Sequence, residues 1–545
     1  MSSPLASSAT VARVAARPRR RFRLEPGEWA LLILFALVSL WVLGLDLYQV
    51  VFHGRVWTGT DGSYVADQLQ YLAWIESASR HFLVANMYVL HGTPSDYFQP
   101  AVAISGLLVA IGMSPWLALL LWKPVGVISL FLAVRLFARR SLPQVGRGAW
   151  LAIIALTLFY GSFTTWDDKF TVLEDLFPGF MSWGYPFALM ALAAIIFAFV
   201  IYAQARRERR VAWSPAVLGA LASILHPWQG ELMVVILGLV ELFSPDTRSA
   251  LSSVRSLRRL GAELATPRVR LAVLTLAGTL LPLLYYAALD KLDMSWALGR
   301  DASRHEMPAL SILLVVAPIG LIALAGYRGA APNFLYRICR VWPLAAAIVF
   351  VQSGSSAGAT PLHTFFGITL PLAVLAVSGC LRLGWRRLRF RRALAVALIL
   401  CFTLPTTYYE MKQAATNARP RTQNANFITR GDRDALRFMR TYPVPGGVLA
   451  RFYIGAAVPA LTGRHTYVGN CIWSEPDCRG RSALTSSLIN ASLTPAQTQA
   501  FVLSTHAHFV FADCGTRSGS PLIRKLGPVL ESVHQFGCAT VYVVQ

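Results

Sequence analysis

Long apolar runs, separated by short polar connections, fill most of the chain up to residue 409. A helix that crosses a bilayer needs roughly 20 apolar residues, and fewer where polar cavities or short helices intervene. The runs predict eleven membrane spans, at 29–51, 115–138, 148–165, 186–203, 214–225, 232–243, 271–288, 308–327, 341–353, 364–381 and 393–409. We interpret the first as a retained anchor, because its apolar core is longer than that of a signal peptide and no small-residue cleavage site follows it.

Arginine placement predicts the orientation of these spans. Arginines precede the first span, so the positive-inside rule puts the N-terminus in the cytoplasm. If the spans alternate, every inward connection is basic; these connections contain Arg139, Arg206, Arg255, Arg337 and Arg386. The apolar stretch 101–113 is short and would invert every later connection if it were a span. We therefore expect it to lie along the outer membrane surface, and the C-terminus to be outside.

The pattern changes after residue 409 to mixed charge, turn signals and amphipathic periodicity. It predicts a helix at 432–439, strands at 448–453, 508–512 and 540–544, and a helix that opens at Thr494-Pro495. The sequence thus predicts an all-α polytopic membrane domain at 29–409, with its N-terminus inside and C-terminus outside. A cytoplasmic, disordered basic tail at 1–28 precedes it, and an extracytoplasmic α/β domain at 410–545 follows.

Four of the seven cysteines fall in the C-terminal domain: Cys471, Cys478, Cys514 and Cys538. An even number of cysteines in a small domain that faces an oxidising compartment indicates two disulfides. Proximity favours Cys471–Cys478 and Cys514–Cys538, although three pairings are possible. Zinc is the alternative, but the Cys-x-x-Cys spacing of zinc knuckles is absent from the sequence.

Composition and charge support a membrane protein. Of the 545 residues, 55% are hydrophobic and 14% charged, with a net charge of +23. Ordinary soluble domains carry about 25% charged residues. The basic excess lies in the tail and the inward connections, so it indicates orientation and predicts no nucleic-acid partner. Of the 50 basic residues, 45 are arginine, a bias typical of GC-rich bacterial genomes, so we expect the cell membrane as the location.

The first outward connection, residues 53–100, is long and rich in polar and aromatic residues. Asp61 and Asp67 follow the first span closely, at the predicted membrane surface. A carboxylate held there can act as a general base towards a hydroxyl acceptor. The alternative is structural, with Asp67 as a helix N-cap and Asp61 as a turn residue.

Two polar features lie within the predicted membrane domain. Lys123 falls inside the second span, and a buried ammonium at membrane depth is a functional hypothesis by default. It could instead pair with Glu231 or extend to the membrane surface. The break between two short spans contains His226, Gln229 and Glu231, and irregular backbone at this depth is expected to line a wet cavity. A purely structural, hydrogen-bonded break is the alternative.

Several segments together resemble the GT-C class of integral-membrane glycosyltransferases. The stretch Asp67-Gln68-Leu69-Gln70-Tyr71-Leu72-Ala73-Trp74 is similar to the segment of the first outer loop where that class often has Asp-Glu followed by an aromatic residue, although Gln68 replaces the Glu. Phe98-Gln99-Pro100 and the apolar stretch after it are similar to the end of the same loop. The outward C-terminal domain, with its run Val458-Pro459-Ala460-Leu461-Thr462-Gly463-Arg464, also resembles that class.

The resemblance implies an inverting transfer from a sugar carried on a polyprenyl phosphate or diphosphate. Asp67 is the first candidate for the general base and Asp61 the second. The resemblance also implies cationic or hydrogen-bonding partners for the lipid phosphate. Candidates are Lys123, Arg300, Arg304, His305 and His363, with His226 and Glu231 as cavity candidates. His363 stands where relatives often have Arg, and each outer residue could alternatively be an interfacial or loop-capping group.

Some GT-C enzymes use a divalent metal, so Mg²⁺ or Mn²⁺ could be held by Asp167 and Asp168 of the second outer connection. Those carboxylates could equally serve to keep the outer face from being basic. No organic cofactor is expected.

The sequence therefore predicts a membrane hexosyl- or pentosyltransferase. It would move a sugar from a polyprenyl-phosphate-linked donor to an extracytoplasmic glycan, lipid or protein of the cell envelope. The alternatives are a polytopic transporter or lipid flippase and a non-catalytic relative in an envelope-assembly complex. Against the transporter, the sequence has one broken pair of spans and no second copy of it.

Overall fold

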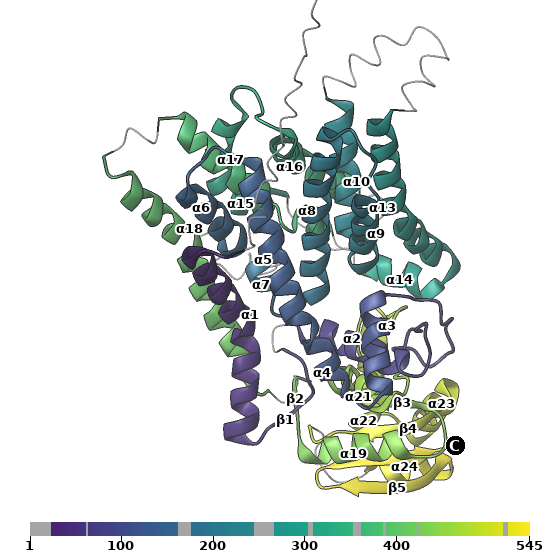
Figure 1. Ribbon diagram of the computed structural model, residues 1–545. Helices are drawn as coiled ribbons and strands as arrows, with labels where there is room; N and C mark the ends of the chain where they lie inside the picture. Colours follow the sequence, from purple (N-terminus) through teal and green to yellow (C-terminus); the bar gives the residue numbers. More distant parts are fainter. Residues whose placement is uncertain are drawn as a thin grey trace, which may run out of the picture.

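The computed structural model describes residues 23–61, 64–161, 176–244, 266–302, 309–352, 361–384, 389–421, 425–515 and 521–545. These residues form a bundle of long helices with a region of small sheets and short helices at one end (Figure 1). The start of the first described helix, Pro26–His53, lies at the opposite end of the bundle, where Glu28 pairs with Arg139. Arg139, Arg206 and Arg340 lie near that end, which we call the basic end, while the C-terminal region lies at what we call the site end.

Eight described helices are long and apolar enough to cross a membrane. They are α1 (Pro26–His53), α4 with α5 (Pro115–Leu120 and Trp122–Ser141), α8 (Pro186–Arg207), α13 (Pro267–Leu292), α15 with η3 (Ala309–Leu324 and Ala325–Tyr327), α16 (Phe334–Gln352), η5 with α17 (Pro361–Phe365 and Thr369–Arg382) and α18 (Arg391–Asn417). A multi-pass membrane domain is thus confirmed.

The other three predicted spans fall on shorter helices, α6 (Arg147–Phe159), α9 (Ser214–Leu225) and α10 (Pro227–Leu242). Figure 1 shows them packed into the same bundle. The number of eleven spans and their inside–outside orientation stay predictions.

Burial separates the centre of the bundle from its lipid-facing surface. Helices α8 and α17 are largely enclosed, with 78% of the apolar window of each buried. By contrast, α1, α13 and α18 present rows of exposed leucines, including Leu37 on α1 and Leu284 on α13. Exposed apolar faces of this extent are expected where lipid is the solvent.

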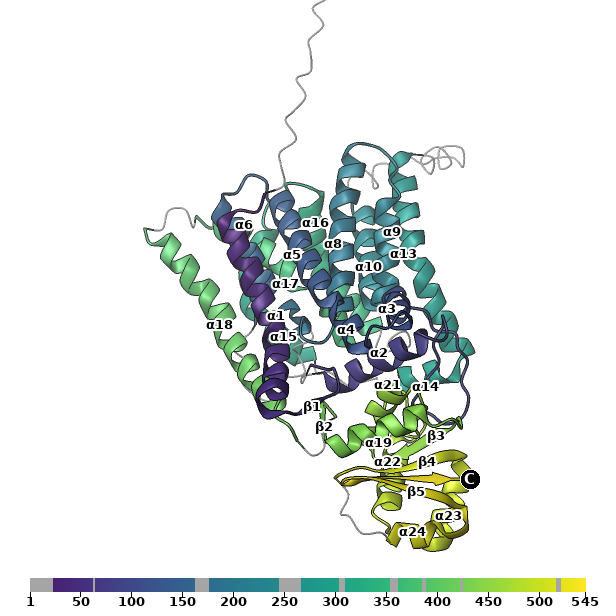
Figure 2. The same cartoon turned by 60° about the horizontal axis from the view of Figure 1, so that its bottom comes forward.

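Two helices of the first connection lie across the site end of the bundle. They are α2 (Val65–Ala78) and α3 (Pro100–Ala110), which pack on each other and on α4 (Figure 2). A Cβ at Gly106 would lie 2.6 Å from the backbone of Ala78, so this close packing requires glycine there. At 11 residues, α3 is about 16 Å long and too short to span.

The C-terminal region is built on a four-stranded sheet of order β3-β4-β6-β5. Its strands are β3 (Gly447–Ala450), β4 (Ala507–Ala512), β5 (Leu530–Phe536) and β6 (Ala539–Val544). The β3–β4 pair is parallel and the other pairs are antiparallel. A second, two-stranded sheet pairs β1 (Val56–Trp57) with β2 (Phe427–Ile428), which fastens the first connection to this region.

Short helices complete the C-terminal region and its contact with the bundle. Within it lie α19 (Arg430–Thr441), α20 (Phe452–Gly455), α21 (Ala457–Thr462), α22 (Cys478–Ile489), α23 (Pro495–Thr505), α24 (Pro521–Leu526) and η7 (Gly527–Val529). In the bundle, α7 (Pro178–Met181) precedes α8 and α14 (Met294–Ala302) follows α13. Helix α21 packs against α2, so the C-terminal region rests on the first connection.

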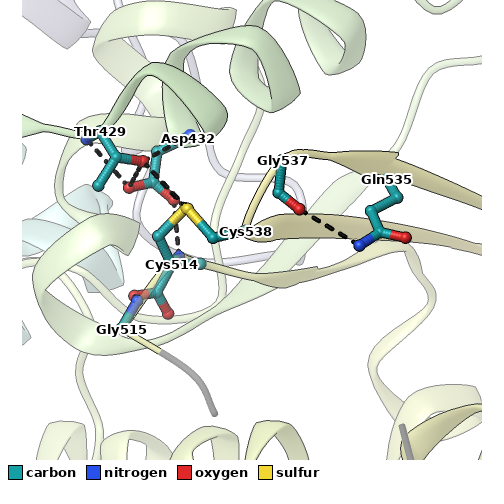
Figure 3. The surroundings of a disulfide bond; sticks show 8 residues. Thr429, Asp432, Cys514, Gly515, Gln535, Gly537 and Cys538 are labelled. Carbon is teal, nitrogen blue, oxygen red and sulfur yellow. Dashed lines mark hydrogen bonds between the residues drawn. A yellow bond between two sulfur atoms is a disulfide. The ribbon is translucent and has the colours of Figure 1, made fainter. Parts of the chain in front are cut away.

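The two preferred disulfides, Cys471–Cys478 and Cys514–Cys538, are both present. The zinc alternative was therefore wrong, because all four sulfurs are bonded in pairs. Figure 3 shows the second disulfide beside the start of α19, where the Thr429 hydroxyl lies 2.9 Å from the Cys514 sulfur. The backbone N–H of Cys514 also donates to Asp432, so this bridge joins the sheet to α19.

Candidate functional site

Four separate segments bring polar side chains together at the site end of the bundle. Asp67 lies on α2, Tyr185 at the start of α8, His226 between α9 and α10, and His363 in η5. Tyr185 donates a hydrogen bond from its hydroxyl to Asp67 Oδ2. The imidazole of His363 interacts electrostatically with the Asp67 carboxylate. The His226 and His363 rings are 5.1 Å apart, which extends the cluster to the break between α9 and α10.

Asp67 is the third residue of α2, and the N-cap is Tyr64, so the N-cap interpretation of Asp67 was wrong. Burial raises the pKa of Asp67, whereas the hydrogen bond from Tyr185 and the charge of His363 act in the opposite direction. A carboxylate with a raised pKa is a stronger base once it is ionised. The nearby hydroxyls of Tyr71 and Tyr88 have pKa values raised by burial and by Asp67, so they stay neutral.

Asp61 lies elsewhere, in a fully buried ion pair. Its Oδ2 is 2.7 Å from Lys123 Nζ, and the side chains are 1% and 6% exposed. Lys123 also lies within hydrogen-bond distance of the Ser39, Ser182 and Trp183 carbonyls. Burial raises the pKa of Asp61 and the ammonium opposes this. The pair joins α1, the first connection, α5 and the segment before α8. Lys123 therefore pairs with Asp61 and not with Glu231, the partner considered from the sequence.

The break between α9 and α10 holds polar groups that lack partners. His226 has extended backbone, with φ −157° and ψ 95°, and Pro227 starts α10. Gln229 is 0% exposed, and neither its amide nitrogen nor its amide oxygen has a hydrogen-bond partner among the described residues. Nδ1 of His226 and Nδ1 of His363 are likewise without partners there. Buried polar atoms of this kind are expected to meet a ligand or water.

Glycine permits the close approach of the two helices at this break. A Cβ at Gly230 would lie 2.1 Å from the Ser223 hydroxyl oxygen and 3.0 Å from the Ser223 Cα. Any larger residue would push α10 away from α9. Trp228, two residues before the glycine, stacks on the His363 ring with 6.4 Å between centroids. Glu231 is partly buried on the same helix.

Aromatic rings form a wall between the site and the C-terminal region. Trp74 of α2 contacts Tyr97 and Trp473, with centroids 4.7 and 5.5 Å apart. Trp296 of α14 contacts Tyr97 and Trp473 in turn, at 4.8 and 4.9 Å. The wall therefore combines α2, the end of the first connection, α14 and the C-terminal region. The rings meet in tilted or edge-to-face contacts, and Trp74, Tyr97 and Trp473 are buried by them.

Arg300, another sequence candidate, is engaged in ion pairs. It pairs with Asp290 and with Asp301, the latter at 3.1 Å. Arg304, His305, Asp167 and Asp168 lie outside the described residues. Within the described ranges, no group of three or more His, Cys, Asp or Glu side chains could hold a metal ion.

Sequence reasoning missed Tyr185, Trp296 and Trp473. Tyr185 stands in Gly184-Tyr185-Pro186, where a proline-started helix begins at the membrane surface, and that signal could have marked it as a residue facing the first connection. The two tryptophans had no signal, because they come from distant segments that only the fold brings together.

The sequence matches no protein-family model and no curated protein. Its fold is similar to that of AglB, the archaeal oligosaccharyltransferase of Archaeoglobus fulgidus, in a structure with an inhibitory peptide and a dolichol-phosphate. That likeness has a TM-score of 0.51 at 14% identity and covers 89% of this chain and 69% of AglB. An AglB structure tethered to an acceptor peptide with the NVT sequon gives 0.51 at 13% identity, over 95% of this chain and 74% of AglB.

The mycobacterial arabinofuranosyltransferase AftD is also similar, with a TM-score of 0.50 at 14% identity. The likeness covers 96% of this chain and 42% of AftD. AglB and AftD are GT-C glycosyltransferases. The chain therefore has a GT-C fold, and the resemblance found in the sequence is confirmed at the level of the fold.

Proposed function

We propose that the chain is a membrane glycosyltransferase that moves a sugar from a polyprenyl-phosphate-linked donor to an extracytoplasmic acceptor of the cell envelope. The observation that carries this proposal is the position of Asp67. Its carboxylate, with a pKa raised by burial, lies on the first connection of a GT-C fold and is held by Tyr185 beside unpartnered polar atoms. The likeness to transferases favours this function over a transporter or flippase.

Asp67 is the proposed general base. The acceptor hydroxyl loses its proton to the Asp67 carboxylate as its oxygen attacks the anomeric carbon of the donor. The bond between that carbon and the phosphate oxygen breaks, and the lipid phosphate leaves with the electron pair. Attack from the face opposite the leaving phosphate inverts the configuration. Tyr185 orients the carboxylate through its hydrogen bond, so its role is positioning.

The leaving lipid phosphate is proposed to lie at the break between α9 and α10. Charge that develops on the phosphate needs hydrogen-bond donors set in place before the reaction. The ring nitrogens of His226 and His363 and the amide of Gln229 can supply them, and none of these unpartnered atoms is committed to another described residue. His363 interacts electrostatically with Asp67, and the His226 ring is 5.1 Å from the His363 ring. AglB, with its bound dolichol-phosphate, shows that this fold accommodates a lipid-linked phosphate in that protein.

Asp61 and Lys123 are proposed to have a structural role that holds the first connection in place. Their ion pair is closed off from solvent, and the Lys123 ammonium is surrounded by carbonyls, so each charge has an opposite partner, although Asp61 Oδ1 has no hydrogen-bond partner among the described residues. The pair fixes the start of the first connection against α5 and the segment before α8. In this proposal neither residue contacts substrate.

A divalent metal held by Asp167 and Asp168 stays a prediction from the sequence, because both residues lie outside the described ranges. One AglB structure, similar to this chain at a TM-score of 0.50, contains Zn and sulfate. The described residues of this chain, however, offer no cluster of metal ligands near Asp67. In the proposed reaction, Asp67 takes the proton and the polar groups of the break bind the phosphate.

The proposed reaction is tested with the purified full-length chain in detergent or nanodiscs. The chain is incubated with a panel of polyprenyl-phosphate sugars, each labelled in the sugar, and with envelope extract as the acceptor. Label should move from the lipid fraction to the glycan, lipid or protein fraction for one donor of the panel. Ion-coupled solute uptake or lipid translocation in proteoliposomes, without label transfer, would contradict the proposal.

A further inference from the structure

A second cavity lies at the basic end of the bundle, far from the cluster around Asp67. Its volume is about 1090 Å³, and the ends of α5, α8, α16 and α17 form its walls. Figure 1 shows these helix ends on the side of the molecule opposite to the C-terminal region. Nothing in the proposed transfer reaction uses this cavity.

Arginines from three helices line the cavity: Arg139, Arg140, Arg206, Arg207 and Arg382. Two of them are neutralised. Arg139 lies 2.6 Å from Glu28, and Arg206 lies 2.9 Å from Glu241. In the part of the chain that the structure describes, the other three form no ion pair with a carboxylate.

These three arginines come from different helices and keep donors for a ligand. Each guanidinium carries five N–H donors. Arg140 bonds Gln204 at 3.1 Å, and Arg382 bonds the Ala330 carbonyl at 3.2 Å. Arg140 and Arg207 repel each other electrostatically, and Glu208 attracts both. An anion between them would relieve this repulsion and accept several charge-assisted hydrogen bonds.

The walls between the arginines combine apolar side chains with a few polar ones, among them Gln204 and Asn333. Val200 and Ala203 of α8, Leu335 of α16 and Leu381 of α17 all face the cavity. A small inorganic anion has no apolar surface to bury against these side chains, whereas a phospholipid has an anionic head group joined to an apolar part. Basic pockets between membrane helices are known to bind head groups of anionic lipids.

We propose that this cavity binds an anionic phospholipid, with its phosphate held by Arg140, Arg207 and Arg382 and its acyl ends against the apolar side chains of the walls. The lipid would fasten the ends of α5, α8 and α17 to one another. If the basic end is cytoplasmic, as the arginine pattern predicts, the ligand comes from the inner leaflet. This site is independent of the proposed transferase site.

Binding is tested by calorimetry on the full-length chain in a nonionic detergent. The ligands are dihexanoyl phosphatidylglycerol, dihexanoyl phosphatidylcholine and inorganic diphosphate. Phosphatidylglycerol should bind at least tenfold more tightly than phosphatidylcholine. In the triple variant Arg140→Gln, Arg207→Gln and Arg382→Gln, its affinity should fall on the order of 100-fold, at about fivefold for each lost charge.

The matched control is the triple variant Arg209→Gln, Arg270→Gln and Arg328→Gln. It removes the same charge from the same end of the bundle, at exposed arginines that do not line the cavity. Its affinity for phosphatidylglycerol should stay within about twofold of the parent chain. An equal loss in both triple variants would show that only the general basic field attracts lipid and would overturn the site. Tight binding of diphosphate without binding of phosphatidylglycerol would overturn the lipid as occupant.

Discussion

The hydroxyl of Tyr185, at the start of α8, donates a hydrogen bond to the carboxylate of Asp67 on α2. This bond joins the membrane bundle to the first connection at the point where the fold also places His363. Each of the three side chains comes from a different segment, so a shift of α2 or α8 would separate them. The proposed general-base catalysis requires that the Tyr185 hydroxyl keep the Asp67 carboxylate in place, which the variants below test.

The pH dependence of transfer should report the ionisation of Asp67. A general base works only when it is deprotonated, so kcat/KM should fall on the acidic side as pH drops through the pKa of Asp67. Burial raises that pKa, which places the acidic limb above the value of about 3.9 typical of an exposed Asp. In Tyr185→Phe the hydrogen bond that lowers the pKa is lost, and the limb should move to higher pH.

The control for this profile is Tyr327→Phe. Tyr327 lies at the basic end, where its hydroxyl donates to the Arg340 carbonyl, so its loss should leave the acidic limb unchanged. A limb that stays in place in Tyr185→Phe, or that moves to lower pH, would remove Tyr185 from its positioning role.

Gln229→Leu should separate stability from donor binding. The Gln229 amide is buried without a described partner, and burying an unsatisfied polar group costs about 1–3 kcal/mol. A leucine of similar size should therefore leave the thermal midpoint of the detergent-solubilised chain unchanged or higher. If the amide binds the donor phosphate, the KM for the lipid-linked sugar should rise about tenfold or more. A lower thermal midpoint with an unchanged KM would indicate a structural amide.

Loss of either partner of the Asp61–Lys123 pair should destabilise the membrane domain. Removing one charge of a buried pair leaves the other uncompensated, at a cost of about 3–5 kcal/mol. Lys123→Met and Asp61→Asn should each lower the free energy of unfolding by that order. The double variant should lose less than the sum of the two single losses. Strictly additive losses in thermal or denaturant unfolding would show that the two charges do not act as a pair.

The disulfide Cys514–Cys538 should stabilise the C-terminal region. The two cysteines are 24 residues apart, and a closed loop of this length is expected to contribute about 3 kcal/mol through the unfolded state. A double variant with serine at both positions should therefore lower the unfolding midpoint of this region. Its matched control is serine at Cys339 and Cys380, which are free thiols in the bundle. Alkylation of Cys514 or Cys538 in an intact, unreduced sample would contradict the pairing.

The sequence predicted the broad architecture because apolar runs and turn signals act locally. Helix α19, the strands β4 and β6 and the proline-opened helix α23 lie where amphipathic patterns placed them, whereas the strand predicted at 448–453 ends at Ala450 and its last two residues belong to α20. Strand β5 was not predicted. Its side chains alternate between partly buried and exposed, and it takes its place by pairing with β6. The pairing of β1 with β2 was also beyond local patterns, because it joins residues about 370 positions apart.

Within the candidate site, the sequence predicted which residues carry reactive groups better than it predicted which residues contact one another. His226 was identified from the break between two spans, and Asp67 and His363 were identified with the help of the resemblance to GT-C enzymes. The fold brings the three residues to one region. Lys123 was identified as unusual, but its partner was not, because nothing in a linear pattern joins residue 123 to residue 61. The same reason kept Trp473 out of the predicted site, since its contacts with Trp74 and Trp296 arise only when the C-terminal region docks.

The most direct test of the central claim is sugar transfer by Asp67→Asn, measured beside the parent chain with the donor that the panel identifies. The control is Asp434→Asn, which makes the same chemical change at a partly exposed carboxylate on α19. Asp67→Asn should lose at least about 100-fold in kcat while it retains donor binding and the parent's unfolding midpoint, because general-base catalysis contributes about 10²–10⁴-fold. Asp434→Asn should stay within about twofold of the parent, as expected for a surface change. Full transfer activity in well-folded Asp67→Asn would contradict the account.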